Sequence, residues 1–179
     1  MNPLLEFPVT DEILTSYALA IGADLLGYRN HIYRVLNFYR AISGIEGLPS
    51  EAVQIAGAFH DLGIWTDQTI DYLEPSVRLA TDYLANRQLS HLSGEVTALI
   101  LEHHKVRSYA ADHALSVEPF RRADIIDVSL GLLTFGLPRA YIKTVKSVLP
   151  NHGFHGMLLR QTARQFLRSP LKPLPMFRW

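Results

Sequence analysis

Residues 51–65 have the sequence EAVQIAGAFHDLGIW, which is almost wholly apolar and rich in small side chains. This composition predicts one buried helix rather than a solvated one. Within it, His60 and Asp61 stand side by side. A buried carboxylate without a partner is costly or takes up a proton, so the pair must have a physical reason. Either the two side chains satisfy each other and nearby backbone, or they hold something charged.

The overall composition indicates one globular domain. The chain has 179 residues, 48% of them apolar, which is enough to bury a core. Its formal net charge is zero, which argues against nucleic acid as the main partner. It has no cysteine, so disulfides, thiolate zinc sites and cysteine nucleophiles are excluded. With neither a leader pattern nor an apolar span of membrane length, we expect a cytoplasmic protein without membrane partners, and leave a homo-oligomer open.

Helical periodicity recurs along most of the chain and predicts an all-α fold, a single-domain helical bundle. Thr10 and Asp11 are expected to cap a first helix that runs to about Gly22. Further helices are expected over residues 25–43, 75–84, 93–103, 117–131, 139–148 and 157–167, with a loop over 66–75. The domain is expected to span residues 1–168, followed by an extended, proline-rich tail over 169–179.

Several polar side chains interrupt apolar helical faces. A helical bundle builds its sites from side chains that project inward from facing helices, so separation along the chain is no obstacle. Imidazoles and carboxylates without sulfur suit a divalent metal ion such as Mn, Fe, Co, Ni or Zn, and Mg is also considered. Two imidazoles and two carboxylates would leave open positions on an octahedral ion, as a catalytic site requires. The interrupting residues are His31, His60, Asp61, His103 or His104, and Asp124.

The order of these residues resembles the HD superfamily of metal-dependent phosphohydrolases. The resemblance covers about residues 24–130 and implies an all-helical fold with one metal on His31, His60, Asp61 and Asp124. Members with two metals usually carry another His between the doublet and the His-His helix. The nearest candidates here are Glu74 and His91, so we expect one metal and leave a second open. The matching segments are YRNH (28–31), AFHDLG (58–63), ILEHH (100–104) and RADIID (122–127).

Roles for the other polar residues follow from the same hypothesis. Asp61 is expected to accept a proton from water, and His103 or His104 to protonate the leaving group. His103 lies on the apolar face of its helix, so we expect it to point inward. Five cationic residues lie close in sequence to the proposed ligands, either as ordinary solvated charges or as a rim for an anionic substrate. They are Arg34, grouped with the catalytic residues, and Lys105, Arg107, Arg121 and Arg122, grouped with substrate binding.

Several of these residues would also fit simpler structural roles. His31 alone would also fit a core histidine. Asp124 could form an ion pair with Arg121, worth only about 0.3–0.5 kcal/mol if exposed. Asp127 fits a ligand, a partner of a ligand or a solvated residue. The remaining histidines stand in polar or glycine-containing segments and are expected at the surface: His113, His152 and His155.

The leading functional hypothesis is metal-assisted hydrolysis of a small phosphoester or nucleotide, as the resemblance implies. Some members of the family use a lysine or acidic residues just after the doublet. Here Ile64 and Trp65 occupy these positions, which argues against cyclic-dinucleotide and alarmone hydrolysis. Their apolar character favours a small neutral substrate, so a cyanamide hydratase-like enzyme or a di-iron oxygenase resembling myo-inositol oxygenase is an alternative. A non-catalytic, ligand-sensing domain is the other alternative to a phosphohydrolase.

Overall fold

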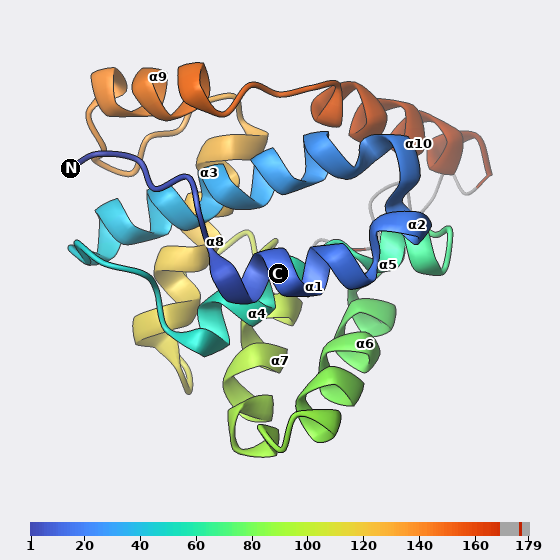
Figure 1. The fold of residues 1–179 in the computed structure, drawn as a ribbon. Helices are drawn as coiled ribbons and strands as arrows, with labels where there is room; N and C mark the ends of the chain where they lie inside the picture. Colours follow the sequence, from blue (N-terminus) through green and yellow to red (C-terminus); the bar gives the residue numbers. More distant parts are fainter. Residues whose placement is uncertain (169–175, 177–179) are drawn as a thin grey trace.

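The computed structural model describes residues 1–168 and residue 176, so the predicted tail at 169–179 lies, except for Met176, outside the described residues. Over the described part every regular element is a helix, which confirms the all-α fold (Figure 1). The elements are α1 (Pro8–Ser16), α2 (Ala18–Ile21), η1 (Gly22–Asp24), α3 (Leu25–Ser43), α4 (Glu51–Phe59), α5 (Gly63–Thr66), α6 (Leu73–Asn86), η2 (Ser90–Leu92), α7 (Ser93–Glu102), α8 (Ala114–Val128), α9 (Arg139–Val148) and α10 (Phe154–Arg168).

The bundle is built around α3. Of its 19 residues, 13 are buried, because other helices cover it on several sides. It packs most extensively against α8 and also contacts α4, α9 and α10. Figure 1 shows α9 and α10 along one side of α3, with α6 and α7 paired at the opposite end of the molecule. The helix ends as predicted: Gly44 has φ +68°, a conformation that glycine adopts without strain, and its N–H bonds to the carbonyl of Arg40.

The prediction of one helix over residues 51–65 is wrong. Ser50 caps α4 by accepting a hydrogen bond from the N–H of Val53, but α4 ends at Phe59 and α5 starts only at Gly63. Residues 60–62 form a tight turn between them. A Cβ on Gly63 would lie 2.7 Å from the carbonyl oxygen of Tyr72, so only glycine allows α5 to approach the start of α6 this closely. The turn places the doublet at the end of a helix.

Other boundaries also differ from the prediction. The first helix starts at Pro8, in accord with the preference of proline for the first helical turn, and it is interrupted at Tyr17. Helix α8 begins at Ala114 and ends at Val128, three residues earlier at both ends than predicted. Helix α9 has the predicted bounds, and α10 starts three residues early at Phe154. Among the described helices, none is long and apolar enough to cross a bilayer.

Candidate metal centre

His31 projects from the middle of α3 and is fully buried. Its Nδ1 lies 2.7 Å from Oδ2 of Asp127 on α8. Because a carboxylate only accepts hydrogen bonds, Nδ1 carries the proton and Nε2 presents a lone pair. Arg34 holds the same carboxylate through hydrogen bonds of 2.5 and 2.8 Å. Burial acts to raise the pKa of Asp127, but Arg34 and His31 hold it well below its usual range.

His60 is oriented by the turn that ends α4. In a continuous helix the N–H of Asp61 would bond to the carbonyl of Gly57; here that N–H lies 3.3 Å from Oη of Tyr28 instead. The freed carbonyl of Gly57 accepts from Nδ1 of His60 at 2.8 Å. Nε2 of His60 therefore also presents a lone pair. Burial lowers the pKa of His60 to about 3, which keeps the ring in the neutral form that metal ligation requires.

The structure brings together all four residues that the resemblance assigns to the metal. Nε2 of His31 lies 3.0 Å from Nε2 of His60, 3.6 Å from Oδ2 of Asp61 and 3.5 Å from Oδ1 of Asp124. Nε2 of His60 lies 3.3 Å and 3.9 Å from the same two oxygens. Neighbouring ligands of an ion bound at about 2.1 Å are separated by about 3.0–3.4 Å. The His31–His60 and His60–Asp61 distances lie in this range, and the other three are longer. His31, His60 and Asp61 therefore fit one coordination sphere as they stand, and Asp124 would join it after a small inward shift.

The chemistry of the donor set also fits a cation. Two imidazole lone pairs face each other at 3.0 Å, an arrangement that is repulsive unless a positive charge lies between them. Both carboxylate oxygens of Asp124 are buried without a hydrogen-bond partner among the described residues. Burial raises the pKa of Asp124 to about 7, and the nearby charges of Asp61 and Asp127 add to the increase. His103 and His31 act to lower this pKa but do not offset the increase, so the ionised form has too little positive charge around it.

A second group of ligand atoms adjoins the first. Asp61, His103 and His104 bring ligand atoms within 4.8 Å of one another, and His103 Nε2 lies 3.5 Å from Asp61 Oδ1. His103 follows the last residue of α7, and its Nδ1 donates to the carbonyl of Ile100 at 2.7 Å, as His60 does at the end of α4. Asp61 thus turns one oxygen toward each group. The predicted inward position of His103 is where the structure places it.

Tyr72, which sequence reasoning missed, completes this side of the centre. Its hydroxyl lies 2.7 Å from Nε2 of His104, and its ring is buried. Nδ1 of His104 lies 3.6 Å from Oδ2 of Asp124. Burial raises the pKa of Tyr72 well above its usual range, and the Asp61 charge adds to this. No pattern in the polar passage over residues 66–75 distinguished this tyrosine from a loop residue.

The two candidates considered for a second metal lie outside the centre. Glu74 and His91 are both exposed, and neither belongs to a group of ligand atoms in the described part of the chain. His113 and His152 are exposed as predicted. The surface position predicted for His155 is wrong: it is half-buried, and its Nε2 donates to the carbonyl of Asp127 at 2.9 Å.

The predicted cationic residues mostly have carboxylate partners. Arg121 donates to both oxygens of Glu118 at 2.8 Å. The ion pair between Arg121 and Asp124, considered as an alternative role for Asp124, is therefore not formed. Arg122 shares Glu118 at 2.7 Å, and Lys105 lies 3.3 Å from Glu102. These partners reduce the positive charge that a substrate would meet. The remaining cation of this set, Arg107, is exposed.

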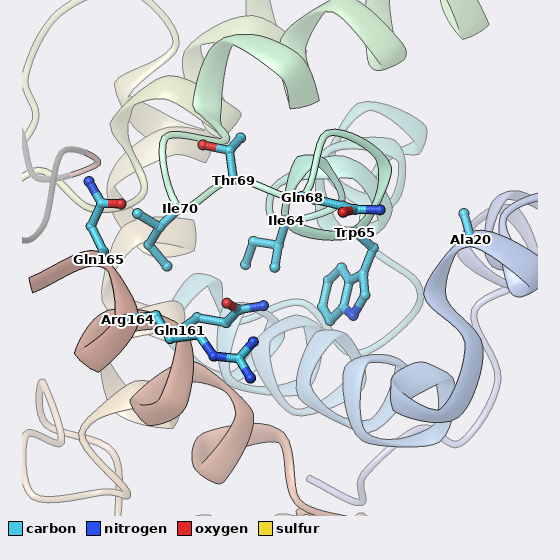
Figure 2. A pocket seen from close by; sticks show the side chains of 9 residues that line it. All are labelled: Ala20, Ile64, Trp65, Gln68, Thr69, Ile70, Gln161, Arg164 and Gln165. Carbon is cyan, nitrogen blue, oxygen red and sulfur yellow. The ribbon is translucent and has the colours of Figure 1, made fainter. Parts of the chain in front are cut away.

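Helix α10 contributes a ring and a cavity wall that the sequence did not indicate. The ring of Phe154 stacks on His31, with centroids 4.2 Å apart. Farther along α10, Gln161 and Arg164 reach toward Ile64 and Trp65 across a cavity of 400 Å³ (Figure 2). The N–H of Ile64 bonds to the carbonyl of Asp61 at 3.0 Å, so this cavity adjoins the segment that carries the doublet. Its other lining residues are Ala20, Gln68, Thr69, Ile70 and Gln165.

Comparisons with known proteins identify one family. The sequence model described as "HD domain" matches residues 28–129, more than half of the chain. This segment contains every residue of both groups of ligand atoms. Neither the comparison with curated proteins nor the comparison with solved structures gave a match.

Proposed function

Because the chain belongs to the HD-domain family, a superfamily of metal-dependent hydrolases, we propose that it is a phosphohydrolase acting on a small phosphoester or nucleotide. The observation that carries this proposal is the convergence of His31, His60 and Asp61, with the buried and unpartnered carboxylate of Asp124 3.5 Å from His31. A divalent ion held there would lower the pKa of a coordinated water and polarise the substrate. The ring orientations support this, because each imidazole has its outer nitrogen fixed by a carboxylate or carbonyl.

The surrounding residues supply the other parts of a hydrolytic site. We propose that Asp61 accepts a proton and that His103 or His104 gives one to a leaving group, because all three face the same centre. Burial acts to lower the pKa of His103, but Asp61 and Asp124 raise it above its usual value, which supports a second proton on this ring. Arg34 does not face the substrate side: it holds Asp127, which orients His31. We therefore assign Arg34 a positioning role.

The substrate is proposed to occupy the cavity between α5 and α10. Its wall combines the apolar side chains of Ile64 and Trp65 with the amide of Gln161 and the guanidinium of Arg164. Such a wall suits a small molecule with one apolar part and one anionic part. Lys105, Arg107 and Arg122 stay candidates for the outer rim of the site. Arg121 does not, because it is 4% exposed and donates to Glu118 and to the carbonyl of Lys105.

The test uses metal content and activity together. Protein purified with added Mn, Co, Ni or Fe is analysed for bound metal and assayed on a panel of phosphomonoesters and nucleotides. His60→Ala is expected to lose the metal and the activity while keeping its helicity. His91→Ala, a change of the same kind at an exposed histidine, is the matched control. Metal-loaded protein without activity on any phosphoester would refute the proposed reaction, and unchanged metal content in His60→Ala would refute the centre.

A two-metal enzyme is the second candidate function, favoured by Asp61. This carboxylate turns one oxygen toward His31 and His60 and the other toward His103, as a bridging ligand would. The di-iron oxygenases on this scaffold need such a pair of sites. His104→Ala should then lower the stoichiometry from two metals per chain to one, and the iron-loaded protein should show an oxygen-dependent absorption change. One metal per chain in both proteins would refute this alternative. A hydratase would be distinguished from both of these enzymes by its activity on a small neutral substrate.

A further inference from the structure

The charge of the chain is divided along the sequence. All 17 acidic residues lie within residues 1–127, together with nine of the 17 basic residues. Residues 128–179 contain eight basic residues and no acidic one. The formal charges of the two parts are therefore −8 and +8, although the net charge of the chain is zero. An asymmetry of this size indicates a charged partner for the basic part.

Part of this basic segment forms a coherent surface at the end of α8. The loop after α8 exposes Leu132, Leu133 and Phe135, with 76%, 54% and 38% of their surfaces accessible. Helix α9 follows, with cations at spacings of four and three residues, which place them on one side of the helix. We call this surface the cationic–apolar patch; it consists of Leu132, Leu133, Phe135, Arg139, Lys143 and Lys146.

The cations of the patch are not neutralised by acidic side chains. Arg139 and Lys146 donate only to backbone carbonyls of the preceding loop, at 3.4 and 2.9 Å, and Lys143 has no ion pair among the described residues. Elsewhere most cations are paired, as Arg87 is with Glu12. A group of three cations without counter-charges raises the local positive potential and attracts an anionic partner.

A cavity lies among the same side chains. Arg139, Lys143 and Lys146 line it together with Leu130 and Gly131 of the loop, and its volume is 220 Å³. This volume is several times the ~30 Å³ that one water molecule occupies, so a phosphate group has room there. No carboxylate lines the cavity. The patch thus offers a cationic recess beside an exposed apolar loop.

We propose that the cationic–apolar patch docks on an anionic phospholipid surface, with a lipid phosphate among the α9 cations and the leucines of the loop in the interfacial region. Basic residues near a membrane surface each contribute about 1 kcal/mol to binding, and exposed apolar side chains add to it by leaving water. The two exposed leucines favour a lipid over a nucleic acid, because aliphatic side chains do not stack on bases. The single aromatic ring of the patch, Phe135, already has the guanidinium of Arg122 over it, 5.7 Å from the ring centroid. The proposal goes beyond the hydrolase activity and does not depend on it.

The test is flotation of the full-length protein with vesicles. Vesicles of phosphatidylcholine alone are compared with vesicles of equal parts phosphatidylcholine and phosphatidylglycerol, at low and high ionic strength. Binding to the anionic vesicles only, and weaker binding at high salt, is the expected result. Lys143→Glu should lower the partition coefficient at least about fivefold. The double variant Leu132→Ser/Leu133→Ser should lower it several-fold.

Matched controls separate the patch from general changes in charge or hydrophobicity. Arg87→Glu makes the same charge change at an exposed arginine outside the basic segment, and Leu19→Ser removes a fully exposed leucine. Both should bind as the wild type does. Absence of binding to anionic vesicles, or binding by both patch variants equal to that of the wild type, would overturn the proposal. It would also be overturned if the leucine variant bound normally while Lys143→Glu lost affinity for a single-stranded oligonucleotide, because the patch would then bind nucleic acid.

Discussion

Replacing Asp124 by asparagine should have opposite effects with and without metal. In the metal-free protein, Asp124 is 1% exposed and neither of its oxygens has a hydrogen-bond partner among the described residues. Burial disfavours the charged form of this carboxylate at a cost of about 1–3 kcal/mol, and asparagine keeps nearly the same shape while removing that charge. Metal-free Asp124→Asn is therefore expected to be more stable than wild type by about 1–3 kcal/mol. For a chain of this size, this corresponds to an increase in Tm of about 2–12 °C.

Bound metal should make the wild type more stable than Asp124→Asn. At a free concentration of about 100 times Kd, one bound ion stabilises the wild type by about 2.7 kcal/mol, which raises Tm by about 5–11 °C. Asp124→Asn should show a much smaller increase, because an amide oxygen is a weaker ligand than a carboxylate. Thermal unfolding followed by circular dichroism, with chelator and then with Mn, Co, Ni or Zn, measures both effects in one series.

An exposed aspartate provides the control for this experiment. Asp82→Asn removes the same charge at a solvated position, so it should match the wild type with chelator and with each metal. Two results would refute the reasoning. One is a Tm that rises with metal equally in wild type and Asp124→Asn, which would place the ion elsewhere. The other is a metal-free Asp124→Asn protein that is clearly less stable than wild type, which would mean that the carboxylate has a stabilising partner.

Three further predictions concern the supports of the centre. Asp127→Asn removes the carboxylate that fixes His31 and should weaken metal affinity about 10- to 100-fold, measured by competition with a chromophoric chelator. Although burial acts to raise the pKa of Glu118, two arginines lower it to about 2, so Glu118→Gln should cost about 1–3 kcal/mol at pH 7. The difference in unfolding free energy between wild type and Glu118→Gln should reach its full value above about pH 4.5, the usual pKa of glutamate, and vanish as the pH falls toward 2. Urea unfolding midpoints measured across this pH range would show it. Gly63→Ala should destabilise by about 1–3 kcal/mol in urea unfolding, whereas Gly47→Ala, with open space around it, should be close to neutral.

Helical periodicity was sufficient to predict the fold class and most helices, because the buried faces of α3, α7 and α9 repeat at three and four residues. It was not sufficient to predict the turn after Phe59. Both sides of that turn are apolar and compatible with a helix, and the turn depends on a contact with Tyr28, which lies 33 residues before Asp61. Local sequence contains no sign of a partner so distant along the chain.

Buried polar side chains in apolar helical faces are energetically costly, so the pattern alone could select a short list of candidate residues. The resemblance to the HD superfamily then assigned His31, His60, Asp61 and Asp124 to the metal. The different roles of Asp124 and Asp127 could not be predicted from the sequence. They lie one turn apart on the same side of α8, so helical periodicity does not distinguish them. Only the packing of α8 against α3 decides that Asp127 meets Nδ1 of His31 and Asp124 meets Nε2.

The net charge of the chain does not describe the local charge that a partner would meet. A value of zero argued against nucleic acid as the main partner, yet it sums two parts with large and opposite charges. Electrostatic attraction is screened within about 8 Å at physiological salt, so a partner responds to the local charge it meets rather than to the total. On the cationic–apolar patch that local charge is positive. The distribution of charge along the chain was therefore the informative quantity.

The structure also bears on how the centre can bind an ion tightly. His31, His60 and His103 each commit the proton of Nδ1 to a carboxylate or a main-chain carbonyl, which fixes the tautomer and leaves Nε2 directed at the centre. Two of the three accepting groups are main-chain carbonyls in the last turns of α4 and α7, so the ends of these helices are themselves part of the site. Little rotamer entropy is then lost on binding, because the rings are already oriented. The free-energy cost is borne in the metal-free state, as facing lone pairs and buried carboxylate oxygens, and a cation relieves it.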